Sequence, residues 1–275
     1  MNRSRPPTPS ERPTTLWVNG RALLTVQTTP QWLDDWAYGL LFSEGVIDGP
    51  EAVRHLEVDG AALAVYVEAD LSPRFRLEMA RRRYVTSGCG KGVTFSSVRD
   101  AMMLKPLEHP LAVDHAQLFK AQKALEEGAA LYRATGGVHS AAVVDAGSGQ
   151  ALIREDIGRH NAVDKAVGAA MASGWNLERC FLVTSGRISY EMCVKLARAR
   201  LAVGASRTAA TDQAVRLADR LRIALVGYLR SERMVVYTDT AGRLKLSDTA
   251  ETGAGSGPEG AEAAVRSTTT VGGTC

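Results

Sequence analysis

The chain has 275 residues, of which 45% are hydrophobic and 23% are charged, and its formal net charge is +3. This length is enough for one large or two modest globular units with a sizeable core, and the composition is that of an ordinary soluble protein. The small net charge gives no reason to expect nucleic acid as a partner. No apolar run is long enough to span a bilayer, so no membrane partner is expected.

The N-terminus, "MNRSRPPTPSERPTT", is polar and rich in proline, and it lacks the apolar stretch of a signal peptide. We therefore expect the protein in the cytoplasm. Its four cysteines, Cys89, Cys180, Cys193 and Cys275, are far apart and form no CxxC pair. A disulfide framework is accordingly not expected.

The first part of the chain predicts a small α+β region. Two apolar runs around Asn19-Gly20 predict a β-hairpin, and a second hairpin is predicted to turn at Asp59-Gly60. Between the two hairpins, residues 28–47 predict a helix with Thr29 as its cap and Gly45 at its end. We expect this region to be rich in antiparallel strands.

From residue 115 onward the pattern changes to alternating helices and strands, which is typical of a layered α/β sheet with helices on its faces. A helix is predicted over residues 115–137. The strands predicted after it cover 139–145, 180–185, 223–230 and 234–239, and the helices cover 161–174, 189–201 and 211–221. The expected organisation is a disordered tail at 1–13, an N-terminal α+β region at 14–110, an α/β core at 111–246 and a low-complexity tail at 247–275.

Cys89 is the first candidate for chemistry. It lies between two glycines in "SGCGKG", with Lys91 beside it and three arginines at 81–83 upstream. Nearby cations favour the thiolate, which is the reactive form of cysteine, and the glycines predict a mobile, accessible loop. The alternative is a small residue in a tight turn. Cys180 and Cys193 fall in apolar patterns that predict buried packing positions.

The run "REDIGRHNAVDK", residues 154–165, is the second candidate because it is polar where the flanking chain is apolar. It follows a predicted strand and opens a helix, whose N-terminal amides attract anions. Arg159 and His160 would add to this site, and Asn161 is a plausible cap. The alternative is a salt-bridged helix cap without a ligand. Ser185 and Arg187 repeat the arrangement after the next strand, where ligands of open α/β sheets bind.

The segment "YLRSER", residues 228–233, is the third candidate. Its arginines at the end of a strand could bind phosphate or the edge of a base, and the alternative is a charged hairpin turn. Two other kinds of site are not supported by the sequence. The H-x-E and P-C-x-x-C signature of zinc deaminases is missing, and so is the G-x-S-x-G elbow of serine hydrolases.

Taken in order, "GGVHSAAVVD", "REDIGRHNAVDK", "TSGRISYEMCVKLARA" and "GYLRSERMVVYT" resemble the formate dehydrogenase accessory sulfurtransferase family (FdhD). The likeness covers roughly residues 14–240. It implies a cytidine-deaminase-like core that has lost the zinc chemistry, and hence an α/β fold with no catalytic metal of its own. It further implies a sulfurtransferase that takes sulfur from a cysteine desulfurase as a persulfide. The sulfur goes to the bound substrate, the molybdenum (or tungsten) bis-pyranopterin guanine dinucleotide cofactor of formate dehydrogenase. A homodimer is also implied.

The resemblance assigns Cys89 as the sulfur-carrying residue, although the Cys-Gly-x-Cys-Gly pattern of the family has lost its second cysteine here. A non-covalent chaperone for the same cofactor is therefore the alternative function, and a nucleotide hydrolase is a third. The predicted cofactor-binding residues, from the resemblance and from the charge pattern, are Tyr228, Leu229, Arg230, Ser231, Glu232, Arg233, Arg159, His160, Asn161, Ser185 and Arg187.

Overall fold

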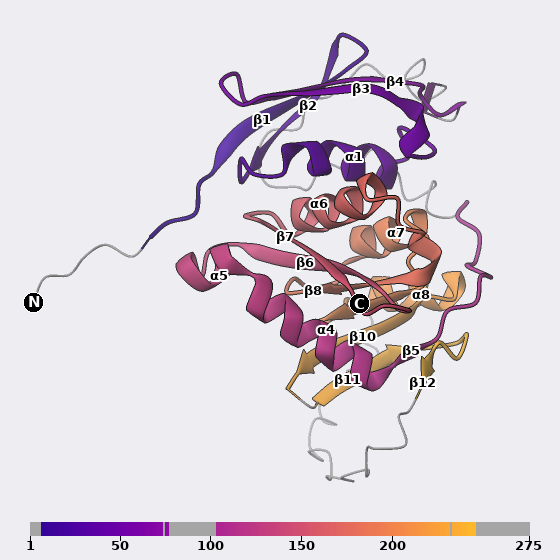
Figure 1. Cartoon of the computed structure of the whole chain (residues 1–275). Coiled ribbons are helices and arrows are strands. Elements are labelled where there is room, and N and C mark those ends of the chain that lie inside the picture. Colours follow the sequence, from indigo (N-terminus) through magenta and orange to yellow (C-terminus); the bar gives the residue numbers. More distant parts are fainter. Residues whose placement is uncertain (1–6, 74, 77–102, 232, 246–275) are drawn as a thin grey trace, which may run out of the picture.

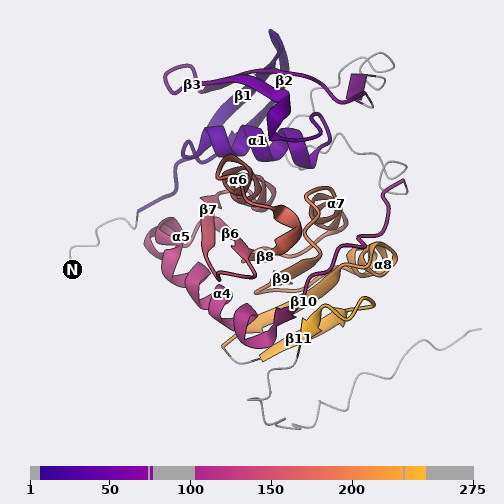
Figure 2. The same ribbon diagram turned by 45° about the vertical axis from the view of Figure 1, so that its right-hand side comes forward.

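The computed structural model describes residues 7–73, 75–76, 103–231 and 233–245. A four-stranded and a six-stranded sheet lie at different levels with helices between them, as Figures 1 and 2 show. A third, two-stranded pairing joins β5 (Val113–Asp114) to β12 (Leu244–Lys245). The expected mixed α/β architecture is confirmed. None of the helices described is long and apolar enough to cross a membrane.

The four-stranded sheet is built from the two predicted hairpins. Its strands are β1 (Arg12–Val18), β2 (Arg21–Thr28), β3 (Val53–Asp59) and β4 (Ala64–Ala69), in the order β2-β1-β4-β3. Asn19 and Gly20 both have positive φ, 49° and 75°, as a type I′ turn requires. In the second, longer turn, the carboxylate of Asp59 accepts hydrogen bonds from the amides of Ala61 and Ala62.

Both hairpins pair antiparallel, as expected, but the sheet also contains one parallel pairing. The chain crosses through a helix between the hairpins, and β4 runs parallel to β1. The expected disordered tail is too long at its C-terminal end, since β1 already begins at Arg12.

The crossover helix α1 (Leu33–Ser43) covers the inner face of this sheet. Trp32, with φ 53°, occupies the N-cap position, so the prediction that Thr29 caps the helix is wrong. Thr29 instead forms hydrogen bonds with the end of β7 (Ala151–Asp156). Its amide donates to the carboxylate of Asp156, and its hydroxyl accepts from the amide of Ile157. Gly45 follows the helix with φ 70°, as predicted for its end.

Helix α1 packs directly on α6 (Arg159–Ala172) through two glycines. A Cβ atom on Gly39 would lie 1.8 Å from the carbonyl oxygen of Asp164, and one on Gly168 would lie 1.8 Å from that of Asp35. The two helix backbones therefore touch. This crossing joins the N-terminal region to the rest of the molecule.

The six-stranded sheet has the order β11-β10-β9-β8-β6-β7. Strands β8, β9 and β10 are parallel neighbours, while β6, β7 and β11 run antiparallel to their partners. One face is covered by α6, α7 and α8, and the other by α4. The strand bounds are β6 (His139–Asp145), β7 (Ala151–Asp156), β8 (Cys180–Thr184), β9 (Val203–Ser206), β10 (Ala224–Arg230) and β11 (Arg233–Thr238).

The other helices with both ends in the described residues are α4 (His115–Gly128), α5 (Ala130–Thr135), α7 (Tyr190–Arg198) and α8 (Asp212–Leu221), with 3-10 turns at Pro50–Ala52 and Leu177–Arg179. The single helix predicted over 115–137 is therefore two helices that meet at Ala129. Strands β7 and β9 were not predicted. β7 ends in three charged residues, and β9 has only four residues, all small or β-branched, so neither shows a long apolar run.

Candidate functional site

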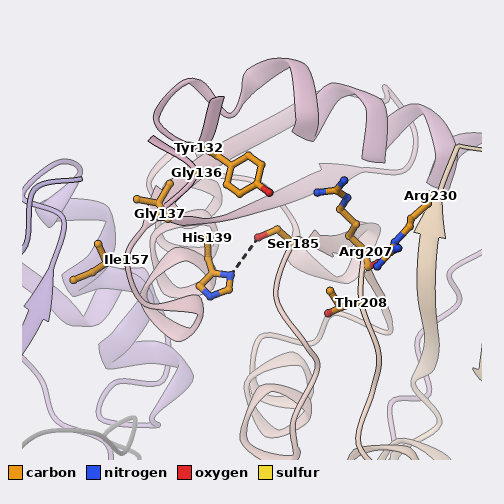
Figure 3. Close-up of a pocket in the computed structure, with 10 residues that line it drawn as sticks. Tyr132, Gly136, Gly137, His139, Ile157, Ser185, Arg207, Thr208 and Arg230 are labelled. Atoms are coloured by element: carbon orange, nitrogen blue, oxygen red, sulfur yellow. Dashed lines mark hydrogen bonds between the residues drawn. The ribbon is translucent and has the colours of Figure 1, made fainter. Parts of the chain in front are cut away.

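The candidate site is a cavity at the edge where the three parallel strands end. Ser185 follows β8, Arg207 and Thr208 follow β9, and Arg230 ends β10. Since the carboxyl ends of parallel strands meet at one edge, residues far apart in the sequence come together there. Figure 3 shows them around a cavity of about 470 Å³, which is the size of an ordinary small-molecule site. The described residues that line it are Tyr132, Gly136, Gly137, Val138, His139, Ile157, Ser185, Arg207, Thr208 and Arg230.

A second cavity of about 710 Å³ adjoins the first at Arg230 and is also lined by Tyr228, Ser231 and Arg233. The backbone that forms it is irregular. A β-bulge interrupts the pairing of β10 with β11, and both Tyr228 and Ser231 have left-handed φ values, 50° and 49°. Non-glycine residues adopt this conformation at a cost, and such strain is common at binding sites. The guanidinium carbon of Arg230 lies 5.9 Å from the centre of the Tyr228 ring.

The predicted segment 228–233 therefore contributes four side chains to the two cavities. The fifth, Leu229, is fully buried in the core, so only its backbone could approach a ligand. Glu232 and Cys89 lie outside the described residues.

His139 and Ser185 form a pair in the lining of the first cavity (Figure 3). The Ser185 hydroxyl lies 3.4 Å from Nδ1 of His139, and it accepts a hydrogen bond from the amide of Ser140. Burial, reinforced by the charge of Arg159, lowers the pKa of His139. The ring is therefore neutral at pH 7, and the arrangement lets Ser185 donate to Nδ1 while Nε2 keeps its proton. His139 is not among the residues predicted from the sequence to bind the cofactor, yet it lines the cavity.

Four predicted residues, Arg159, His160, Asn161 and Arg187, line neither cavity. Asn161 is not the helix cap, because α6 begins at Arg159 with Gly158 in the cap position. The Asn161 side chain instead donates to Asp156 and to the carbonyl of Gln27. A direct role in binding stays a prediction for all four residues.

His160 does not supply the positive charge expected of it. Burial, together with the charge of Lys195, lowers its pKa to about 3, so it is neutral at pH 7. Glu191 lies 3.3 Å from its Nε2, but the geometry makes no hydrogen bond among the described residues. Arg159 lies close to His139, which lines the first cavity. A Cβ atom placed on Gly186 would contact both the Cβ atom of Arg159 and the ring of His139.

The other charges of the run 154–165 are held inside the protein. The carboxylate of Asp156 accepts a hydrogen bond of 2.6 Å from the buried ammonium of Lys165. The carboxylate of Glu155 accepts hydrogen bonds from the backbone amides of Leu131 and Tyr132 at the start of α5. Asp164 is bonded by Lys195 from α7. For these carboxylates and lysines, the structure therefore agrees with the alternative interpretation of the run, in which its charges form salt bridges and hold no ligand.

Cys180 and Cys193 are fully buried, as predicted, and burial raises the pKa of each thiol to about 12. Neither is a reactive thiolate at neutral pH. Over the described ranges, no group of three His, Cys, Asp or Glu side chains is placed to hold a metal ion.

The fold and cavity define a mixed α/β protein with an arginine-lined cavity at the carboxyl edge of its parallel strands. Residues 9–245 match the model of the FdhD/NarQ family, and the chain belongs to this family.

The relatives and a solved structure agree with this assignment. A protein of Listeria monocytogenes serotype 4b (strain F2365) is 35% identical over 83% of this chain and 88% of its own length, and one of Shouchella clausii (strain KSM-K16) is 36% identical over 84% and 88%. Both are named sulfur carrier protein FdhD. The crystal structure of a putative formate dehydrogenase accessory protein from Desulfotalea psychrophila has the same fold. Its TM-score is 0.70 at 24% identity, over 86% of this chain and 90% of that one.

Proposed function

We propose that the protein is a sulfur carrier for the maturation of formate dehydrogenase. It would take sulfur from a cysteine desulfurase and pass it to the molybdenum or tungsten bis-pyranopterin guanine dinucleotide cofactor, which it binds as substrate. The observation that carries the proposal is the cationic double cavity, found in a chain whose relatives are named sulfur carriers.

The cavities suit the cofactor in charge and in length. A guanine dinucleotide carries a pyrophosphate, and the guanidinium groups of Arg230 and Arg233 are matched to its oxygens. The two cavities meet at Arg230, so a ligand longer than one nucleotide could extend through both. Tyr228 offers a half-exposed ring on which a base could stack.

Cys89 is the proposed carrier. Its thiolate would attack the terminal sulfur of the desulfurase persulfide, so a new S–S bond forms on Cys89 and the desulfurase thiolate leaves. In the second step, an electron pair of the acceptor forms a bond to the same terminal sulfur, the S–S bond breaks, and its electron pair returns to Cys89 as the thiolate. One cysteine is enough for this sequence, so the missing second cysteine does not prevent it. Cys180 and Cys193 are unsuitable because they are buried with raised pKa values.

Three further features belong to this proposal. They are a core related to cytidine deaminases, a homodimer, and a location in the cytoplasm. The first rests on the resemblance of the sequence motifs and the second on the family likeness. The third rests on the four widely separated cysteines, which suit a reducing compartment.

Mass spectrometry tests the carrier role directly. The full chain is incubated with a cysteine desulfurase and cysteine, and we expect a mass increase of one sulfur atom on the Cys89 peptide. Cys89→Ser should show no adduct and should fail to restore formate dehydrogenase activity in cells that lack the native accessory protein. Cys180→Ser is the matched control, and its folded fraction should carry sulfur normally.

The loss of the second cysteine of the Cys-Gly-x-Cys-Gly pattern favours a non-covalent cofactor chaperone as the second candidate function. This candidate predicts that Cys89→Ser restores full formate dehydrogenase activity without any sulfur adduct. That result would overturn the carrier role.

A further inference from the structure

Arg207 was not singled out by the sequence, yet it faces the same cavity as Arg230. It follows the short strand β9, next to β10 in the sheet. In Figure 3 the two side chains approach the cavity from neighbouring strand ends, with the ring of Tyr132 nearby. The backbone holds this arrangement, because the amide of Arg207 donates to the carbonyl of Thr184 on β8.

The two arginines are held differently. Nε of Arg230 donates to the carbonyl oxygen of Arg207 at 3.0 Å, which fixes the Arg230 side chain against β9. Nε of Arg207 lies 3.4 Å from a carboxylate oxygen of Glu126, but it is buried and makes no hydrogen bond to any residue that the structure describes. Both side chains of this ion pair are about half exposed, at 40% and 53%. A pair of this kind is weak and readily exchanged for a better anion.

The lining of the first cavity is complementary to an anion. Among its described residues are two arginines and the neutral ring of His139, and none is acidic. Two guanidinium groups at adjacent strand ends can each offer a planar pair of N–H donors to phosphate oxygens. One arginine suffices for a single phosphate, whereas two suit a diphosphate.

We propose that Arg207 pairs with Arg230 in binding the diphosphate, in addition to Arg233 of the second cavity, and that it leaves Glu126 when the ligand binds. The inference rests on the proposed function, because the diphosphate would be that of the guanine nucleotide part of the cofactor. It adds a residue and a competing carboxylate that the motif 228–233 does not contain. Glu126 pairs with Arg207 when no diphosphate is bound, and this competition sets how tightly the diphosphate binds.

Isothermal titration of the full chain with GDP and GMP tests this pair. The wild-type protein should bind GDP more tightly than GMP. Arg207→Ala should weaken GDP binding by about ten- to a hundredfold, the effect of losing a charged hydrogen bond, and should reduce the preference for GDP. The GDP affinity of Arg207→Lys should lie between those of the wild type and Arg207→Ala. Arg216→Ala, which removes an exposed arginine paired with Asp212 on α8, is the control and should leave binding unchanged.

Glu126→Gln provides the opposite test, because removing the competing carboxylate should tighten GDP binding severalfold. If the Arg207–Glu126 ion pair only stabilised the fold, its removal would not tighten GDP binding. Unchanged GDP affinity in Glu126→Gln and in Arg207→Ala would overturn the inference and leave the proposed function standing. If Arg207→Ala does not fold, Glu126→Gln decides alone. A wild-type protein that binds neither nucleotide would overturn the cofactor site itself, and this inference with it.

Discussion

Two regions of the molecule concentrate charge, and they use it in opposite ways. At the junction of α1, α6 and α7, charged groups are buried and bonded to one another, as in the contacts of Lys195 with Asp164 and Glu44. At the carboxyl edge of β8, β9 and β10, arginines face open cavities, and Nε of Arg207 has no hydrogen bond among the described residues. The comparison teaches that the density of charged residues in a sequence does not locate a ligand. Arginines that line a cavity and keep a donor without a hydrogen bond are the better guide.

The largest expected effect comes from breaking the internal network. Lys195→Met leaves the Asp164 carboxylate buried without its ammonium partner, and we expect a loss of about 3–5 kcal/mol in the free energy of unfolding. The measurement is urea unfolding of the full chain, followed by tryptophan fluorescence.

The matched control is Arg200→Ala, which removes an ion pair with Glu178 whose side chains are 51% and 37% exposed. Exposed pairs contribute little, so this loss should stay below about 1 kcal/mol. Equal losses in the two variants would mean that the buried network is no more important than a surface pair.

The second effect concerns how the N-terminal region is attached. In Gly168→Ala, a methyl group would meet the backbone of Asp35, so α1 and α6 must separate. We expect a loss of about 1–3 kcal/mol in unfolding free energy, the usual cost of overpacking. Gly60→Ala is the control, since a Cβ there has no heavy atom within 4 Å. A Gly168→Ala protein as stable as the wild type would show that the helices do not touch as described.

The third and smallest effect is a dependence of stability on pH. His160 has a usual pKa of 6.5 but a pKa of about 3 in the folded protein. The unfolded chain therefore takes up a proton below pH 6.5 that the folded chain does not, and stability falls as pH falls from 6.5 toward 3. Between pH 6.5 and 5.5 this group should cost about 1 kcal/mol.

His160→Gln should reduce that slope by roughly one proton, measured from urea unfolding at several pH values. Burial lowers the pKa of His139 and of His109 as well, so part of the slope should remain in the variant. If the free energy of unfolding depends on pH with the same slope in both proteins, His160 takes up its proton equally in the folded and the unfolded chain, which would contradict the lowered pKa.

Local patterns in the sequence predicted local features. The Asn19-Gly20 turn depends on two adjacent residues, and the burial of Cys180 and Cys193 follows from apolar residues beside them. Arg230 was found for the same reason, because it ends a strand with a clear apolar run.

The features that the sequence did not reveal depend on distant partners. Lys165 donates to the carbonyl of Thr29, and Asp164 accepts from the hydroxyl of Ser43, both more than a hundred residues away. Nothing near these residues in the sequence shows that their charges are already paired. Arg207 was missed because β9 is too short to be recognised, so the polar residues after it looked like an ordinary loop.

Hydrogen–deuterium exchange of the full chain, with and without GDP, tests most directly whether the ligand binds at the strand edge rather than at the polar run. We predict slower exchange in peptides covering residues 204–212 and 224–231, and no change in peptides from the interior of α6. Slower exchange confined to residues 154–168, with 204–212 and 224–231 unchanged, would contradict this placement of the site.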